Sequence, residues 1–222
     1  MSHRYWPLFE LSLTTPELDL RPMTEADLPR LGDLLPDDLE LDPAATRFAA
    51  LDETTSRAIV MHQAYWRSYG TWTAEQWRLN FVVRHEGQVI GTQELEGNDF
   101  ARLRTVDSSS FLVPGARGRG LGKQMRRAVL GLAFGPLEAE AAITSAWHDN
   151  HASLGVSRAL GYQPNGEELH RRDDGVDVMV HLRLTRAQWE TAGGGDDLTI
   201  VGFEPCRPFF GVALTTEQPD PA

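Results

Sequence analysis

A glycine-rich stretch at residues 117–123, Arg-Gly-Arg-Gly-Leu-Gly-Lys, limits what this chain can fold into more than any other feature. Apolar residues at 111–113 precede it, and a segment with apolar residues at helical spacing, 121–137, follows it. This order predicts a strand, a glycine loop and the start of a helix. Glycine lets the backbone take positive φ and approach a ligand closely. The first helical turn adds unpaired N–H groups and partial positive charge, so we expect an anion site suited to phosphate.

Three phosphate-binding patterns compete for this stretch. A Walker loop requires a glycine where Arg117 stands and a serine or threonine where Gln124 stands. A Rossmann fingerprint requires a glycine at the position of Lys123. The third pattern, Arg/Gln-x-x-Gly-x-Gly/Ala, is satisfied by Arg117, Gly120 and Gly122. The alternatives are a plain glycine turn at a helix start and an Arg-Gly patch for nucleic acid.

A second motif lies further along the chain, where Asn150 and Ser153 open a predicted helix that ends at Gly161 and Tyr162. Together, and in this order, the two motifs resemble those of the GNAT superfamily of acyl-CoA-dependent N-acyltransferases. The resemblance covers about residues 14–185. It is nearest to the ribosomal-protein N-acetyltransferase subgroup, the RimJ/RimL type, which carries the Asn-x-x-Ser form.

The pattern of apolar residues predicts the elements. Strands are expected at 18–23, 79–84, 89–95, 105–113, 141–147, 168–172 and 176–184, with an edge strand at 198–201. Helices are expected at about 25–35, from 54 onward, at 120–135 and at 152–160. The resemblance implies an α/β (α+β) GNAT fold, a mixed, mostly antiparallel sheet of six to seven strands flanked by helices, with splayed central strands. We expect a domain at 14–192 after an irregular lead at 1–13. An extension at 193–222 would dock on the domain or on the partner subunit of a homodimer.

Composition narrows the class of protein. The formal net charge of −11 argues against a general nucleic-acid binder and suits a cationic partner such as an amine. Cys206 is the only cysteine, which excludes an intrachain disulfide and fits a reducing cytoplasm. No apolar segment has the length of a membrane helix, and the N-terminus lacks a secretory apolar run. We therefore expect a cytoplasmic protein with neither membrane nor nucleic-acid partners.

The resemblance implies where the cosubstrate binds. Acyl-CoA would enter between the splayed strands, and its pantetheine arm would pair with the strand backbone at Leu112 and Val113. The pyrophosphate would bind the loop that follows, at Arg117, Gly118, Arg119, Gly120, Leu121, Gly122 and Lys123. Asn150 would bond to the pantetheine, or would only cap its helix. We expect acetyl-CoA or succinyl-CoA as cosubstrate and no metal.

The resemblance also implies direct attack of an amine on the thioester, so the site needs a base for the amine and an acid for the departing thiolate. Ser153 matches the subgroup's proton-donating serine, with helix capping as the alternative. The tyrosine that serves many family members is replaced by Ser157. The subgroup's glutamate falls near Arg171 and Arg172, where no carboxylate stands. Asp107 is the candidate base, acting directly or through water, with a structural hydrogen-bonding role as the alternative. His148, Asp149 and His170 are weaker candidates.

The sequence thus predicts an N-acyltransferase that moves an acyl group, acetyl by family default, to a primary amine of a protein or small molecule. Deprotonation at pH 7 costs about 4–5 kcal/mol for a lysine and about 1 kcal/mol for a protein N-terminus, so a missing strong base favours the easier acceptor. His62 and Trp66 are candidate acceptor contacts. Succinyl transfer would need a cation near the thioester, such as His62, Arg67 or Arg104. A third interpretation is a non-catalytic domain that senses acyl-CoA.

Overall fold

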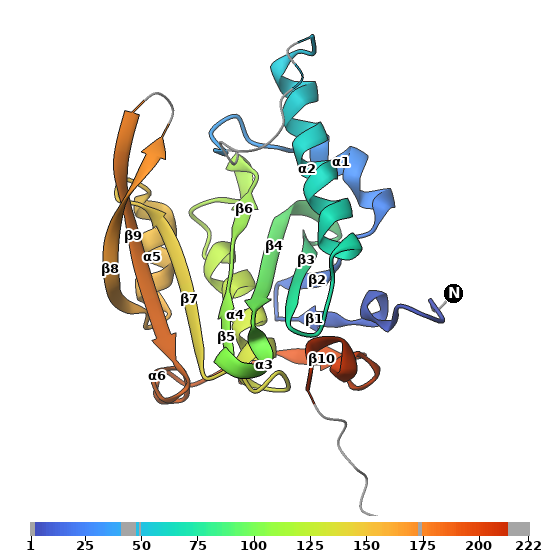
Figure 1. The fold of residues 1–222 in the computed structure, drawn as a ribbon, viewed down its shortest axis with the longest axis vertical. Coiled ribbons are helices and arrows are strands. Elements are labelled where there is room, and N and C mark those ends of the chain that lie inside the picture. The colour runs from blue at the N-terminus through green and yellow to red at the C-terminus, as the bar shows by residue number, and fades with distance from the viewer. Residues whose placement is uncertain (1–2, 41–47, 49, 173–174, 213–222) are drawn as a thin grey trace, which may run out of the picture.

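The computed structural model describes residues 3–40, 48, 50–172 and 175–212 (Figure 1). Within these residues the strands form a single sheet. They are β1 (Ser12–Thr14), β2 (Leu18–Pro22), β3 (Gln76–His85), β4 (Gln88–Asn98), β5 (Thr105–Asp107), β6 (Ser110–Leu112), β7 (Ala141–Trp147), β8 (Gln163–Arg172), β9 (Gly175–Thr185) and β10 (Thr199–Val201).

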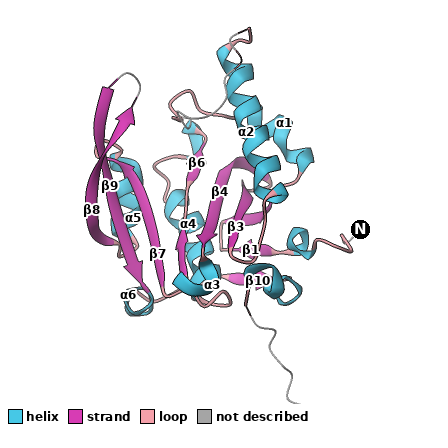
Figure 2. Ribbon diagram, viewed as in Figure 1, coloured by secondary structure: helices cyan, strands magenta, loops and turns pink. Residues whose placement is uncertain are grey.

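Helices flank the sheet (Figure 2). The α-helices are α1 (Leu28–Asp33), α2 (Glu53–Gly70), α3 (Phe100–Leu103), α4 (Leu121–Phe134), α5 (His151–Ala159) and α6 (Arg186–Thr191). The 3-10 helices are η1 (Pro7–Glu10), η2 (Glu25–Asp27), η3 (Pro114–Ala116) and η4 (Glu204–Phe210). Over the described ranges, no helix combines the length and the apolar character needed to cross a membrane.

The strand order is β10-β1-β2-β3-β4-β5-β7-β9-β8, and β6 pairs with β4 beyond the end of β5. Every pairing is antiparallel except that of β5 with β7, which is parallel. The predicted mixed, mostly antiparallel sheet flanked by helices is therefore confirmed. The predicted count of six to seven strands is wrong, because the sheet has ten. One reason is that the strand expected at 105–113 is interrupted at Ser108 and Ser109.

One face of the sheet is apolar and supports helix α4. Leu79 of β3, Leu95 of β4 and Val106 of β5 are buried in the main hydrophobic cluster. The helix contributes the face that its spacing predicts, with buried Leu121, Met125, Val129 and Leu132. Because side chains alternate along a strand, the neighbouring residues of β4 and β5 point to the opposite face.

Helices α1 and α2 cover that opposite face over β2 and β3, and their cluster also reaches Val89 at the start of β4 and Phe111 of β6. Val82 of β3 is buried in a second cluster with Leu28 and Leu31 of α1 and Tyr65 of α2. The side chain of Asn80 on β3 also donates a hydrogen bond to Ser68 Oγ of α2 at 3.1 Å. Toward β4 and β5 the same face carries charged side chains, which form part of the candidate site.

The expected irregular lead at 1–13 is wrong in its conformation, because this segment contains η1 and most of β1. Leu8 and Leu13 are fully buried in the main cluster. Strand β1 lies between β2 and β10, so it is not an edge of the sheet. The edge strand that the sequence suggests near residue 200 is present as β10.

The described part of the C-terminal extension packs on the domain. Phe210 is fully buried, and its ring lies edge-to-face against Trp72 and Trp77, with centroid distances of 5.5 and 4.8 Å. Trp72 Nε1 donates a hydrogen bond to the carbonyl of Phe209 at 2.8 Å. Residues 213–222 lie outside the described residues. The division of the chain at residues 14 and 192 stays a prediction.

Candidate active site

Strands β6 and β7 part from each other and open the sheet. Strand β5 pairs with β7 as far as Asp107 and Ile143. Beyond that point β6 pairs with β4 alone, and β7 pairs with β9 alone (Figure 1). The facing edges of β6 and β7 therefore keep backbone groups that a ligand can bond. This confirms the splayed central strands that the resemblance implies.

The glycine loop leads from this opening into α4. Gly118 and Gly120 have φ of 73° and 82°, a region that other residues rarely enter. A Cβ at either position would meet no atom within 4 Å, so space beside the loop is open. The N–H groups of residues 118–122 have no backbone partner in the described part of the chain. Together with the N-terminus of α4, these groups are suited to an anion, and the predicted phosphate site stays a prediction.

The three cations of the loop differ in their partners. Arg117 makes two hydrogen bonds to Asp38, at 2.5 and 2.8 Å, and these bonds hold the pKa of Asp38 below its usual value. Arg119 Nη2 lies 3.1 Å from His85 Nε2. Lys123 is exposed. A carboxylate therefore occupies the guanidinium fork of Arg117, where the resemblance implies a pyrophosphate.

The two predicted pantetheine positions are not equivalent. The N–H of Val113 donates to the carbonyl of Ile90 on β4 at 2.9 Å, so it points into the sheet. The neighbouring residue Leu112 points its backbone groups to the other edge, toward the opening. Its carbonyl accepts a hydrogen bond from Arg117 Nε at 2.9 Å. Only Leu112 is therefore suited to pair with a ligand in the opening.

The glycine loop packs against the helix of the second motif, α5, at Gly122. A Cβ at this position would lie 3.6 Å from Leu112 of β6 and 3.7 Å from Val156 of α5. The loop, the strand and the helix of the second motif are thus packed together. At the start of α5, Asn150 Oδ1 accepts a hydrogen bond from the N–H of Ser153 at 3.0 Å. Asn150 therefore acts as a helix cap in this structure.

The predicted acid and base lie on different sides of the sheet. Ser153 is half-buried on α5, which packs against α4 and β7. Its carbonyl accepts a hydrogen bond from Ser157 Oγ at 3.1 Å, while its hydroxyl has no partner within the described ranges. Asp107 ends β5 on the face away from α4. The structure does not bring the two side chains into contact, and the opening between β6 and β7 separates them.

Three carboxylates gather on the face that carries Asp107, which we call the carboxylate face. Glu96 of β4 is in register with Asp107, and Glu94 is two residues earlier on the same side. Arg78 of β3 lies among them, with Nη2 2.5 Å from Glu96 and Nε 3.6 Å from Glu94. The hydroxyl of Ser109 donates to Glu94 Oε1 at 3.1 Å.

Burial raises the pKa of Glu94 to about 7 and that of Asp107 to about 6. Arg78 opposes the rise at Glu94, whereas repulsion from Glu96 adds to it. At Asp107 the N–H of Ser108, which donates at 2.6 Å, opposes the rise, and Glu96 again adds to it. Both values lie near neutral pH, where a carboxylate is most effective as a general base.

Sequence reasoning found Asp107 but missed Glu94 and Glu96. The signal is the alternation of these two acids with Leu95, which in a strand places both on one face. Arg172 stands where the subgroup's glutamate was sought. It bonds to Glu40, Asp149 and Asp177 at distances between 2.5 and 3.1 Å. The structure therefore places no carboxylate at positions 171 and 172, and it offers carboxylates on β4 and β5 beside the opening.

A buried polar cluster lies where the sheet opens. Arg126 of α4 is only 4% exposed, and its Nη1 donates to Thr144 Oγ1 of β7 at 3.3 Å. That hydroxyl donates to the carbonyl of Ser108 at 3.3 Å. Within the described residues, the buried Arg126 Nε, Ser108 Oγ and Tyr162 hydroxyl make no hydrogen bond of good geometry, although Ser108 and Arg126 lie near enough to the Tyr162 hydroxyl to act on its pKa. The opening therefore contains polar groups suited to bond to water or a ligand.

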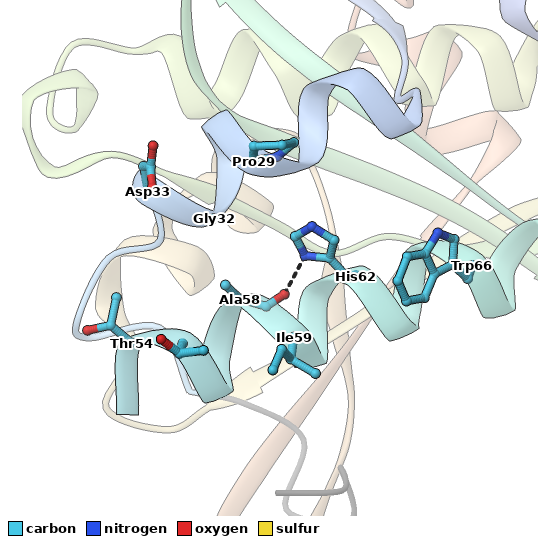
Figure 3. A pocket seen from close by; sticks show the side chains of 9 residues that line it. Pro29, Gly32, Asp33, Thr54, Ala58, Ile59, His62 and Trp66 are labelled. Carbon is cyan, nitrogen blue, oxygen red and sulfur yellow. Dashed lines mark hydrogen bonds between the residues drawn. The ribbon is translucent and has the colours of Figure 1, made fainter. Parts of the chain in front are cut away.

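His62 and Trp66 lie in a surface pocket of about 420 Å³ between α1 and α2 (Figure 3). The His62 Nδ1 is 2.7 Å from the carbonyl of Ala58, and the two aromatic rings are 5.8 Å apart. None of the residues that line this pocket belongs to the carboxylate face. Their role as acceptor contacts stays a prediction.

Comparison with known proteins agrees with this arrangement. Residues 17–163 match the family model described as the acetyltransferase (GNAT) domain. The fold is similar to that of RimJ from Mycobacterium smegmatis, solved with CoA-disulfide, with a TM-score of 0.63, 16% identity, and coverage of 84% of this chain and 96% of that one. It is also similar to a chimera of the spermidine N-acetyltransferase SpeG from Vibrio cholerae and hSSAT, with a TM-score of 0.61, 15% identity, and coverage of 78% and 98%. The chain belongs to the GNAT acetyltransferase family and is an acyl-CoA-dependent N-acyltransferase.

Proposed function

We propose that the protein transfers an acetyl group from acetyl-CoA to a cationic primary amine, with Glu94 or Asp107 as the base. The observation that carries this proposal is the carboxylate face, which bears three acids next to the opening between β6 and β7. The negative charge attracts a protonated amine. The raised pKa values let the same face accept a proton once the amine has arrived.

The chemistry then has one attack and two proton movements. The amine nitrogen forms a bond to the thioester carbon, and the carbon–sulfur bond breaks to release CoA thiolate. The base takes one proton from the ammonium group, so that a neutral nitrogen attacks. The second proton leaves the nitrogen once the carbon–nitrogen bond has formed, and it passes to the departing thiolate or to water. A hydrogen bond from the Ser153 hydroxyl would stabilise the departing sulfur, whose thiol titrates near pH 8.5 and is therefore a fair leaving group.

Ser153→Ala tests this role of the serine. Turnover should fall by about 10–100-fold, the worth of one hydrogen bond to a charged group, with acetyl-CoA affinity nearly unchanged. Ser157→Ala is the matched control on the same helix, because that hydroxyl is already bonded to the carbonyl of Ser153. Unaltered turnover in Ser153→Ala would leave Ser153 with only its place in the helix cap.

The carboxylate face favours acetyl over succinyl. A succinyl carboxylate beside the opening would meet Glu94, Glu96 and Asp107, and the cation that lies among them, Arg78, is already paired with Glu94 and Glu96. Arg67 lies exposed on α2, and Arg104 stacks on the ring of Phe100 at 5.4 Å. Succinyl-CoA nevertheless stays the alternative cosubstrate. A non-catalytic acyl-CoA sensor stays the alternative function, and the two raised pKa values argue against it.

The class of acceptor is inferred from resemblance. Both motifs are similar to those of the RimJ/RimL type, whose acceptors are protein amines, whereas one structural neighbour is a spermidine acetyltransferase. An acceptor screen should therefore contain N-terminal peptides, lysine peptides and polyamines. A homodimer in the cytoplasm, without nucleic-acid or membrane partners, remains our expectation.

Calorimetric titration with acetyl-CoA and succinyl-CoA tests the cosubstrate. Acetyl-CoA should bind more tightly, and tighter succinyl-CoA binding would overturn the acetyl assignment. Gly120→Val should weaken acetyl-CoA binding by about 10-fold or more, because a β-branched residue at positive φ costs about 1–3 kcal/mol and distorts the loop. Gly193→Val is the matched control, since Gly193 also has positive φ and open space but lies in the C-terminal extension. Equal losses in both variants would refute the loop assignment.

A further inference from the structure

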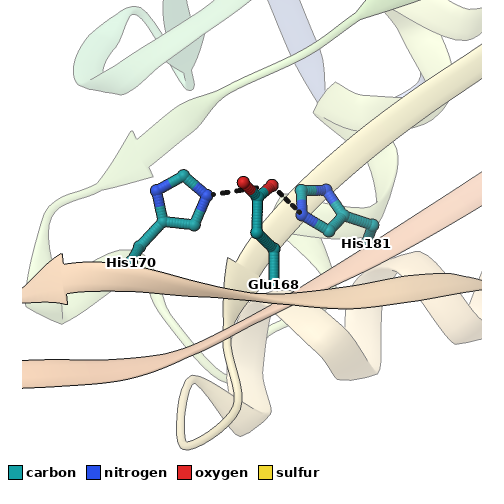
Figure 4. A group of neighbouring side chains, drawn as sticks. All are labelled: Glu168, His170 and His181. Carbon is teal, nitrogen blue, oxygen red and sulfur yellow. Dashed lines mark ion pairs between the residues drawn. The ribbon is translucent and has the colours of Figure 1, made fainter.

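Three metal-ligating side chains converge on the hairpin of β8 and β9. His170 Nε2 lies 3.2 Å from Glu168 Oε2, and His181 Nε2 lies 3.5 Å from the same oxygen. One ligand atom from each residue lies within 4.8 Å of the other two. Figure 4 shows both rings turned toward the carboxylate.

The strand pairing brings these residues together. Glu168 of β8 is in register with Met179 of β9, and His181 is two residues further along β9. His170 is two residues beyond Glu168 on β8. Because side chains two apart share a face, all three point to the same side of the sheet. Residues 170 and 181 are far enough apart in sequence that no short metal motif reveals them.

The chemistry of the set is that of a zinc site. Two imidazoles and one carboxylate are a known ligand combination for Zn²⁺, which binds nitrogen and oxygen ligands at about 2.0–2.2 Å. A tetrahedral site of that size separates its ligand atoms by roughly 3.3–3.5 Å. The two separations from Glu168, 3.2 and 3.5 Å, lie within about 0.1 Å of this range. The two imidazole nitrogens lie within 4.8 Å of each other, so rotation of the rings would have to shorten that distance when the metal binds.

One observation separates a metal site from ordinary ion pairs between histidine and glutamate. The Nε2 of His181 is buried, and its contact with Glu168 Oε2 at 3.5 Å is an ion pair without the geometry of a hydrogen bond. A buried ring nitrogen without a hydrogen bond costs about 1–3 kcal/mol, so a purely structural histidine is expected to make one. By contrast, His148 on the same side of the molecule has an ordinary pair, with Nδ1 3.0 Å from Asp177.

We propose that Glu168, His170 and His181 bind one divalent transition-metal ion, with Zn²⁺ as the best match. The site would lie on the carboxylate face, because Asp107, Ile143 and Arg183 are in register and His181 is two residues from Arg183. Three protein ligands leave the fourth position of a tetrahedral ion to water or to a donor atom of a bound molecule. This inference goes against the sequence-based prediction of no metal and does not depend on the acceptor.

Titration of the metal-free full chain with ZnCl₂ tests the proposal. One equivalent should bind, and Co²⁺ added in its place should give the visible absorption of a four-coordinate ion. His181→Ala and Glu168→Gln should each weaken binding by more than about 10-fold, since even residues that only orient ligands are worth about 10–100-fold. Glu168→Gln keeps the shape of the side chain, so its result does not depend on a folding defect.

His148→Ala is the matched control and should bind Zn²⁺ as the unmodified protein does. Circular dichroism of each variant checks that the hairpin remains folded. Absence of binding to the unmodified chain, or equal losses in His148→Ala and His181→Ala, would overturn the proposal. Octahedral Co²⁺ spectra would overturn the assignment of a tetrahedral site.

Discussion

The two faces of strand β4 obey different physical rules. Leu95 points to the α4 side and is fully buried among apolar residues, where its neighbours need only the right volume. Glu94 and Glu96 point to the carboxylate face and depend on Arg78 and Ser109 for their partners. The apolar face stabilises the fold, whereas the carboxylate face is destabilised by mutual repulsion and retained beside the site.

This contrast places activity and stability on adjacent residues. Burial of a carboxyl group disfavours its charged form, and the resulting rise in pKa measures the free-energy cost of ionising the group in the folded protein. The cost is useful only if the group exchanges a proton during turnover. Substitutions at positions 94 and 95 should therefore separate the two roles.

The largest expected effect is on turnover. Glu94→Gln removes the proton acceptor while keeping the shape of the side chain, so kcat/KM should fall by about 10²–10⁴-fold, a typical value for general-base catalysis. In the unmodified enzyme kcat/KM should rise with pH through about 6–7, because the base must be ionised. Steady-state assays of amine acetylation across this range measure both.

Asp107→Asn is the companion variant. If Glu94 is the base, Asp107→Asn should reduce kcat/KM by less than Glu94→Gln and leave the pH profile in place. A larger loss of kcat/KM in Asp107→Asn would indicate that Asp107, and not Glu94, is the base. Unchanged turnover in both variants would contradict the proposal that the carboxylate face accepts the proton.

The next effect concerns the apolar face. Leu95→Ala should lower the free energy of unfolding by about 2–5 kcal/mol, because it leaves a cavity beneath α4. Denaturant titration measures the loss. The control is Glu94→Gln, which should not destabilise the protein. Equal destabilisation by the two variants would show that the two faces do not differ as described.

The smallest effect is the pH dependence of stability. The folded state raises the pKa of Glu94 from 4.5 to about 7, so it binds this proton more tightly than the unfolded chain does. The free energy of unfolding should therefore decrease as pH rises between these values, by at most about 3 kcal/mol from this group. Glu94→Gln should flatten that slope in thermal or denaturant unfolding from pH 5 to 8. An unchanged slope would indicate that Glu94 titrates normally.

Local patterns predicted much of the fold. The strand expected at 141–147 has those bounds, and the helix expected at 120–135 differs from α4 by one residue at each end. The break at Ser108 and Ser109 could not be read locally, because it depends on pairing with β4 on one side and β7 on the other. Strand β1 was missed because three residues are too short for a periodic signal.

The candidate site was predictable only where one continuous segment forms it. The glycine loop is such a segment, and its positive φ angles agree with its glycines. Arg117 and Asp38 are distant in sequence, so no local motif could predict their ion pair. Family positions do not point to Glu94. Its signal is the alternation of Glu94 and Glu96 with Leu95, which places both acids on one face of a strand.

The position of β1 has a consequence for how the chain matures. Leu13 pairs with Ile200, so this strand finds its outer neighbour only after the segment around residue 200 has left the ribosome. Until then the outer N–H and C=O groups of β1 are open to association with other chains. A product of premature termination before residue 199 would keep that edge exposed permanently. The outer edge of β1 is therefore covered only in chains that contain β10.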